Sequence, residues 1–170
     1  MAARPRDHLD AIAKQWRHER PDLDVAALAL VGRLFRVVDL VGTELAGPLR
    51  AHGLESGWFD LIAALRRAGP PYELHPTDLM ATTMLSSGGM TKRIDRLVDA
   101  GLVQRRADPG DRRATLVRLT PRGKRTADAA LETHLAGEER LLAALNGAER
   151  RSLDAVLRKL LAALEGRAHR

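Results

Sequence analysis

The fold is decided by residues 85–120, which read LSSGGMTKRIDRLVDAGLVQRRADPGDRRATLVRLT. Within this stretch, residues 89–100 carry apolar side chains at helical spacing, and Gly101 follows where a glycine commonly ends a helix. Residues 76–81 predict a short helix before it, so the two segments form a helix-turn-helix pattern. The apolar face of the second helix consists of Met90, Ile94, Leu97 and Val98.

A β-hairpin is predicted directly after this second helix. Residues 102–106 and 115–119 have the length and partial alternation of strands, and the turn-rich segment 108–113 joins them. Two helices followed by a hairpin with a basic tip are typical of a winged helix. We therefore expect a mainly α fold whose DNA-binding lobe carries a two-stranded β-wing.

Before the helix-turn-helix, the periodicity predicts three helices. Residues 7–19 carry a narrow apolar stripe that stops before Arg20-Pro21, since a residue before proline avoids the helical region. The next helix, capped by Asp22 or Asp24, keeps its apolar period to about residue 50 and ends at His52-Gly53. Residues 54–67 predict a third helix, with its inward face formed by Phe59, Ile62 and Leu65.

After the wing, two more helices are expected. Thr120-Pro121 begins one that runs to about Leu145, and Asn146 with Glu149 resembles a capping box that opens the last. The last helix has a wide apolar stripe formed by Leu153, Val156, Leu157, Leu160, Leu161 and Leu164.

The helices at both ends have more apolar surface than a winged helix can cover, which predicts a dimer interface. The alternative is that they pack against each other within one subunit. We divide the chain into an extra N-terminal helix and first dimerisation helix (1–53), a winged helix-turn-helix lobe (54–120) and C-terminal dimerisation helices (121–170).

Composition narrows the class of protein. A chain of 170 residues suits a single module, and an aromatic share of 3% favours helices over a β-sandwich or barrel. The absence of cysteine excludes disulfides, thiolate metal sites and thiol redox sensing. No stretch reaches the roughly 18 apolar residues of a membrane span, and residues 1–6 lack the apolar core of a signal peptide, so we expect a cytoplasmic protein with no membrane partner.

Charge points to a nucleic acid. The net charge is +6 and the pI is near 10.6, and all but four of the 28 basic residues are arginines, which bind phosphates and guanine edges in pairs of hydrogen bonds. A genome biased toward arginine codons explains the overall count equally well. The positions of the basic residues must therefore show whether the arginines serve nucleic-acid binding.

The start of the second helix of a helix-turn-helix meets DNA in the major groove. Small hydroxyl residues there let the backbone approach phosphates, the helix N-terminus attracts anions, and a lysine adds charge. The residues concerned are Ser86, Ser87, Gly88, Thr91 and Lys92. In the alternative reading, Ser86 or Ser87 only caps the helix.

The tip of the hairpin holds Asp111, Arg112 and Arg113. An arginine presented by a narrow ribbon suits the minor groove, where A·T-rich stretches concentrate negative potential. We interpret Asp111 as a brace that pairs with a neighbouring arginine and fixes the wing, although a charged turn is often just solvated.

Residues 85–103, 108–113 and 117–120 together resemble the MarR family of bacterial transcriptional regulators. The resemblance covers essentially the whole chain. It implies a homodimer joined through the N- and C-terminal helices, with two winged-helix lobes on a pseudo-palindromic operator of double-stranded DNA. It also implies that Arg113 enters the minor groove.

A finer resemblance is to the urate-responsive branch of that family, whose members carry an extra N-terminal helix. It implies a ligand site of Trp16, Asp60, Arg93 and Arg105. Two guanidiniums and an indole face suit a flat anionic heterocycle such as urate or a related purine. Without ligand, Asp60 is expected to pair with Arg93. An anion would compete for that arginine and shift the DNA-binding lobes.

These features predict a ligand-responsive regulator, expected to act as a repressor, with no cofactor and no metal. Alternative ligands are a phenolic or other aromatic acid, or a metal held by His52 with Glu55 or Asp60. A further alternative is a DNA-binding protein without any ligand, which leaves the Trp16 helix without a role. An enzyme is excluded, because the six histidines are far apart and no nucleophile or phosphate-binding motif occurs.

Overall fold

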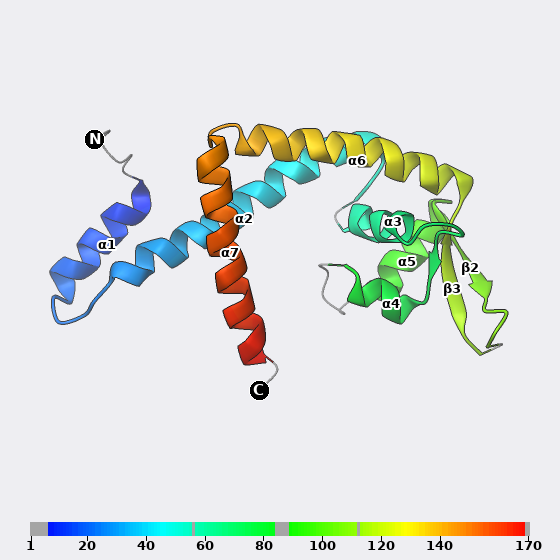
Figure 1. Cartoon of the computed structure of the whole chain (residues 1–170), viewed down its shortest axis with the longest axis horizontal. Coiled ribbons are helices and arrows are strands. Elements are labelled where there is room, and N and C mark those ends of the chain that lie inside the picture. The colour runs from blue at the N-terminus through cyan, green and yellow to red at the C-terminus, as the bar shows by residue number, and fades with distance from the viewer. Residues whose placement is uncertain (1–6, 56, 84–88, 112, 169–170) are drawn as a thin grey trace. The chain divides into compact units, whose positions relative to one another are not determined.

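The computed structural model describes residues 7–55, 57–83, 89–111 and 113–168. As predicted, the chain is mainly helical with a small antiparallel sheet (Figure 1). It forms two compact units, Met1–Leu45 and Ala46–Arg170, and the boundary falls near the end of the second helix. No helix in the described ranges has the length and apolarity needed to cross a membrane.

In the first unit, helix α1 (His8–Glu19) confirms the predicted helix and ends before Arg20. Asp7 opens it with a capping box: its carboxylate accepts from the backbone N–H groups of Leu9 and Asp10, and the Asp10 side chain accepts from the N–H of Asp7. Leu9 and Ala13 are buried against Ala29 of the next helix.

Helix α2 (Ala26–Leu49) confirms the long predicted helix. Its start resolves the choice of cap, because Asp24 Oδ1 accepts from the N–H of Ala26 at 2.9 Å while Asp22 pairs with Arg20 at 2.6 Å. A 3₁₀ turn, η1 (Arg50–His52), follows, and Gly53 leaves it with a φ of 70°, a left-handed conformation that glycine adopts easily.

In the second unit, helix α3 (Trp58–Arg67) begins four residues later than predicted. Gly57 precedes it with a φ of 79°, which breaks the helical path, and Leu54 is buried without being helical. The inward face was predicted correctly, since Phe59, Ile62 and Leu65 are buried.

The helix-turn-helix consists of α4 (Pro76–Ala81) and α5 (Met90–Asp99). Gly101, with a φ of 66°, confirms the predicted helix end: its N–H donates to Val98 O, and the N–H of Leu102 donates to Leu97 O. Strands β2 (Val103–Ala107) and β3 (Thr115–Leu119) form the predicted hairpin.

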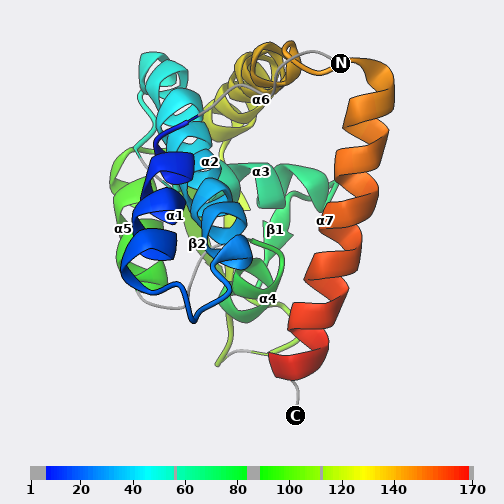
Figure 2. The same cartoon turned by 90° about the vertical axis from the view of Figure 1, so that its left-hand side faces the viewer.

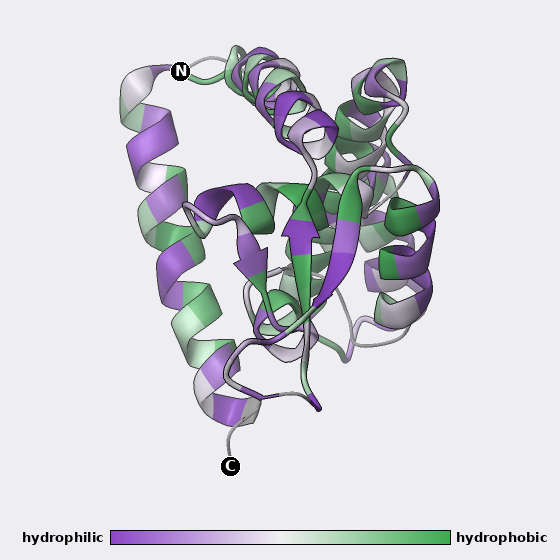
Figure 3. Ribbon diagram, turned by 90° about the vertical axis from the view of Figure 1, so that its right-hand side faces the viewer, coloured by the Kyte–Doolittle hydropathy of each residue, from purple (hydrophilic) through white to green (hydrophobic). Residues whose placement is uncertain are grey.

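A third strand, β1 (Glu73–Leu74), was missed by the sequence analysis, because two residues are too few to show alternation. It pairs antiparallel with β3, so the strand order is β1-β3-β2, with the three strands side by side in Figure 3. The sheet packs on the helices through one apolar core. Its fully buried side chains are Leu61, Ile62, Leu65, Leu79, Ile94, Leu97, Val103 and Val117.

Helix α6 (Pro121–Leu142) starts as predicted, with the Thr120 side chain accepting from the N–H of Gly123 at 2.9 Å. It ends three residues before the expected Leu145, where the Arg150 guanidinium donates to the carbonyls of Leu142 and Leu145. That arginine therefore stabilises the corner between the last two helices.

Helix α7 (Gly147–Ala168) opens with the predicted capping box: Asn146 Oδ1 accepts from the N–H of Glu149, and Glu149 Oε2 accepts from that of Asn146. Figure 2 shows it as one continuous helix. Its predicted apolar stripe is exposed along its length, with Val156 64% and Leu161 56% accessible.

Candidate nucleic-acid and ligand sites

The N-terminal turn of α5 presents the predicted contact residues that the structure describes. Thr91 and Lys92 are exposed there, whereas residues 86–88 lie outside the described ranges. The N-cap is Gly89, with a φ of 82°, so neither Ser86 nor Ser87 occupies that position. Glycine has no side chain that could cap the first turn of α5. The backbone N–H groups of that turn therefore suit an anion such as a phosphate.

Three other elements fix the orientation of α5. Arg105 of β2 pairs with Asp95 at 2.6 Å, and Arg96 pairs with Glu55, just before α3, at 3.1 Å. At the other end of the helix, Arg122 of α6 donates to the carbonyl oxygen of Ala100 at 3.1 Å. The helix is therefore in contact with β2, with the segment before α3 and with α6.

Two aspartates shape the wing turn. Asp108 Oδ1 accepts from the N–H of Gly110 at 2.7 Å, and Asp111 Oδ1 accepts from the N–H of Arg113 at 2.9 Å. Asp111 thus braces the turn, but within the described residues it does so through a backbone N–H rather than through a guanidinium. Arg113 is exposed beside it, and Arg112 lies outside the described ranges.

The base of the sheet carries charged contacts that the sequence analysis missed. Glu73 Oε2 is buried and lies 3.8 Å from both Arg106 Nη1 and Arg118 Nε, and His75 Nε2 lies 3.1 Å from Asp108 Oδ2. The partners in each contact are about 30 residues or more apart in the chain, so no local sequence motif predicts these contacts.

Among the predicted ligand residues, Asp60 stands out. Its carboxyl is half-buried on α3, and this burial raises its pKa, against the opposing effects of nearby His134 and Arg67. His134, on α6, packs its ring 4.6 Å from that of Phe59, and its Nε2 lies 3.2 Å from Glu138 Oε1. His134 was missed by the sequence analysis, since it lies far from Asp60 in the chain.

The expected pair between Asp60 and Arg93 is not among the ion pairs that the structure gives for the described residues, so this pair stays a prediction. His134 and Arg67 act on the Asp60 carboxyl. Arg93 lies on α5 with its guanidinium near Gly89.

Trp16 and the other three ligand residues belong to different units. Trp16 lies on α1 with 48% of its side chain accessible, whereas Asp60, Arg93 and Arg105 belong to the second unit. The four-residue site therefore remains a prediction.

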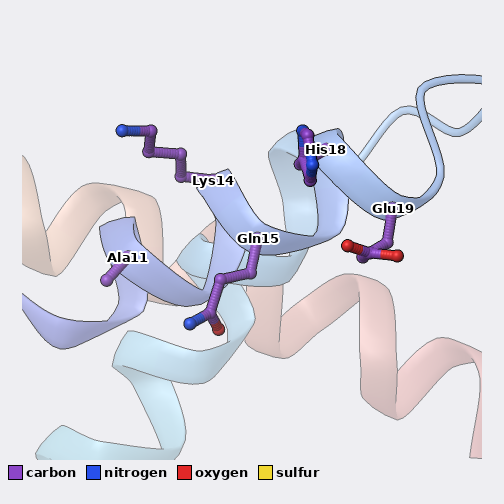
Figure 4. Close-up of a pocket in the computed structure, with 5 residues that line it drawn as sticks. All are labelled: Ala11, Lys14, Gln15, His18 and Glu19. Atoms are coloured by element: carbon purple, nitrogen blue, oxygen red, sulfur yellow. The ribbon is translucent and has the colours of Figure 1, made fainter.

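A shallow depression lies along α1. Figure 4 shows that its five lining side chains come from this one helix and point in different directions, so they form no enclosed site. These residues are Ala11, Lys14, Gln15, His18 and Glu19.

The described residues also offer little to a metal ion. No three His, Asp or Glu side chains among them come close enough to share one. His52, part of the metal alternative, instead bonds through Nε2 to Thr133 Oγ1 at 2.7 Å.

Comparison with known proteins decides the family. Residues 52–114 match the family model described as MarR family. The HTH-type transcriptional regulator PecS of Dickeya dadantii is 36% identical over 146 residues, which cover 86% of this chain and 88% of that protein. The chain belongs to the MarR family. It is accordingly a transcriptional regulator and not an enzyme.

Solved MarR-family structures share its fold. A cysteine mutant of Escherichia coli MarR, crystallised with operator DNA, matches with a TM-score of 0.69 and 25% identity over 81% of this chain and 97% of that one. Bordetella bronchiseptica BpsR, whose DNA binding is regulated by 6-hydroxynicotinic acid, matches with a TM-score of 0.67 and 27% identity over 76% of this chain and 91% of that one.

Proposed function

We propose that this MarR-family protein is a repressor that binds a pseudo-palindromic operator as a homodimer and releases it when a small anionic aromatic ligand binds. The observation that carries the proposal is the winged helix itself, with an exposed α5 N-terminus and an exposed Arg113 on a braced turn. The likeness to an operator-bound MarR supports the same mode of binding.

On DNA, the start of α5 would enter the major groove. Lys92 would pair with a phosphate, and Thr91 and the first-turn amides would donate hydrogen bonds to the backbone. We also assign contacts with the DNA to Ser86, Ser87 and Gly88, which precede this helix in the sequence. From the wing, Arg113 would enter the minor groove with Asp111 holding the turn, and we assign a further contact with the DNA to Arg112.

A homodimer is supported by the apolar side chains left exposed on the long helices. In α2, Phe35 is 73% accessible and Val38 is 69% accessible, and the stripe of α7 is exposed as well. Exposed apolar patches of this extent commonly mark interfaces between proteins. Two copies joined through these helices would present two winged lobes to an operator with matching two-fold symmetry.

Ligand control is assigned to Trp16, Asp60, Arg93 and Arg105. A half-buried carboxyl with a raised pKa is costly to keep ionised and is common at functional sites, which supports a role for Asp60. Arg105 holds α5 through Asp95 at 2.6 Å, so an anion that binds this guanidinium would compete with Asp95 and loosen the recognition helix.

We propose urate or a related purine as the ligand class, with an aromatic acid as the second candidate. The second candidate is favoured by BpsR, which responds to 6-hydroxynicotinic acid, another flat anionic ring. Both classes would use the same arginines, so only direct comparison separates them.

The test is a mobility shift with a promoter fragment that the protein binds, titrated with urate, xanthine, 6-hydroxynicotinic acid and salicylate. The wild type should release the fragment with at least one of them, and Trp16→Ala and Arg105→Ala should need a higher concentration. Arg125→Ala, which removes an exposed arginine of α6 outside both sites, is the matched control. Release that is equal in all four proteins would contradict the assigned pocket.

A further inference from the structure

One residue joins the helix-turn-helix to the base of the wing. His75 directly precedes Pro76 and occupies the N-cap position of α4, where Ser, Thr, Asp or Asn usually caps the helix. Within the described residues, its side chain makes no capping hydrogen bond. Its Nε2 lies 3.1 Å from Asp108 Oδ2 instead. The side chain therefore reaches away from its own helix toward the wing.

Asp108 uses its two carboxylate oxygens for different tasks. Oδ1 accepts from the N–H of Gly110 at 2.7 Å and so shapes the turn, while Oδ2 faces the imidazole of His75. The backbone N–H of Asp108 also donates to Ala114 O at 3.1 Å, across the mouth of the hairpin. Only 20% of the Asp108 side chain is accessible, so water screens this contact less than it screens a fully exposed pair.

The other charged groups on the neighbouring elements do not oppose the contact between His75 and Asp108. Glu73 of β1 lies 3.8 Å from Arg106 of β2 and from Arg118 of β3, so these three side chains form their own cluster. Asp78, in the first turn of α4, is the remaining carboxylate close to His75 in the chain, and it also favours a positive imidazole.

We propose that His75 is a positioning residue for DNA binding: when protonated, it holds the base of the wing against the start of the helix-turn-helix through Asp108. The inference rests on the proposed function, because it assumes that α5 and the wing grip the same duplex. A charged imidazolium–carboxylate bond is stronger than its neutral counterpart, and histidines commonly titrate between pH 5 and 8.

The direction of the pH effect follows from the charge. At low pH the imidazolium holds the wing in place before DNA arrives. When the imidazole loses its proton at higher pH, the wing is held more weakly. Binding to DNA then costs more conformational entropy of the wing. The affinity for DNA should therefore fall as the pH rises.

The experiment uses the full chain and a labelled duplex that the protein itself selects from random-sequence DNA. Fluorescence anisotropy gives Kd at pH 6 and pH 8 at equal ionic strength. We expect the ratio of Kd at pH 8 to Kd at pH 6 to be about two- to fivefold larger for the wild type than for variants without the pair. Comparing ratios cancels the contribution of other titrating groups.

Two variants remove the pair without disturbing its surroundings. Asp108→Asn keeps an oxygen that accepts from the N–H of Gly110 but removes the charge. His75→Ser puts a good capping residue at the start of α4. Both variants should show a smaller ratio of Kd at pH 8 to Kd at pH 6 than the wild type. The double variant should show the same ratio as either single variant, because the two residues act through one contact.

The control is His8→Gln, which removes an exposed imidazole of α1 and should keep the wild-type ratio. If both pair variants also keep the wild-type ratio while binding DNA, the role of His75 is overturned and the proposed function stands. If the wild type selects no duplex at either pH, the proposed function itself fails, and the role of His75 fails with it.

Discussion

At the scale of single residues, the ionised carboxylate of Asp60 lowers the free energy of unfolding. Burial raises its pKa, so the unfolded chain ionises at a lower pH than the folded protein does. The free energy of unfolding therefore falls as the pH rises between those two values and stays lower above them. Carboxyl groups with raised pKa values are common at functional sites, which fits the proposed role of Asp60 in ligand binding.

We predict that Asp60→Asn raises the free energy of unfolding at pH 7, and that this advantage shrinks as the pH falls toward the ordinary range of an aspartate. Urea denaturation at pH 7 and near pH 3.5 measures it. Glu132→Gln, on the exposed surface of α6, should give no such pattern. A loss of stability at pH 7 in the Asp60 variant would mean that its interactions outweigh its burial.

Gly123 carries a different constraint, which comes from the close approach of α6 to the end of α5. A Cβ at this position would collide with the backbone carbonyl of Leu102, which no change of rotamer can relieve. We predict that Gly123→Ala destabilises the protein by about 3 kcal/mol, measured by thermal denaturation. Gly166→Ala is the matched control, because its Cβ would meet nothing and alanine favours a helix, so stability should hold or rise.

At the scale of elements, two ion pairs hold α1 against α2. Arg33 of α2 pairs with Asp7 at 2.7 Å and with Asp10 at 2.6 Å. The hydrogen bond from Arg33 is the largest cause that lowers the pKa of Asp7 from 3.8 to about 2. The stabilisation is therefore present above pH 3.8 and is lost as the pH falls through about 2.

We predict that Arg33→Ala moves the titration of the Asp7 carboxyl, followed by carbon NMR, up toward 3.8 and speeds tryptic cleavage at Lys14 and Arg17. Arg36→Ala breaks a pair with Asp39 inside α2 and should change neither measurement. An unshifted Asp7 in the Arg33 variant would show that the capping contacts of α1 suffice alone.

The recognition helix and the wing should contribute to DNA binding in different ways. Lys92→Ala should reduce the slope of log K against log salt concentration by roughly one for each bound chain, since each chain loses one phosphate contact. Arg113→Ala should weaken binding by about tenfold and relax the preference for A·T pairs under the wing. Anisotropy titrations over a salt series, with Arg125→Ala as control, measure both, and unchanged slope and affinity would remove these assignments.

The sequence predicted most elements because their signals are local. The capping box of Asn146 and Glu149, the Thr120 cap and the Gly101 helix end each lie within a few residues, and the structure confirms all three. The late start of α3 was missed because Gly57 in a left-handed conformation cannot be told from a helical glycine by periodicity.

The charged contacts of the candidate sites were harder to foresee. Asp95 with Arg105 and His75 with Asp108 join residues on different elements, and their pairing depends on how β1, α4 and α5 pack on the sheet. For the same reason the sequence did not show that His134 acts on the Asp60 carboxyl, which depends on the packing of α3 on α6.

At the scale of the whole molecule, the exposed apolar faces of α2 and α7 support the proposed homodimer. We predict that Phe35→Glu and Leu160→Glu each weaken self-association, because they place a charge in the proposed interface. Sedimentation should then give the mass of a single 18.6 kDa chain in place of a dimer. Arg151→Glu, at an exposed polar position of α7, is the matched control.

The central claim is that two copies grip one duplex, and light scattering on the purified complex with a selected promoter fragment tests it most directly. We predict a mass equal to two chains and one duplex, and a dimer of the free protein at the same concentration. A monomer bound to DNA, or equal binding to random-sequence fragments, would contradict the account.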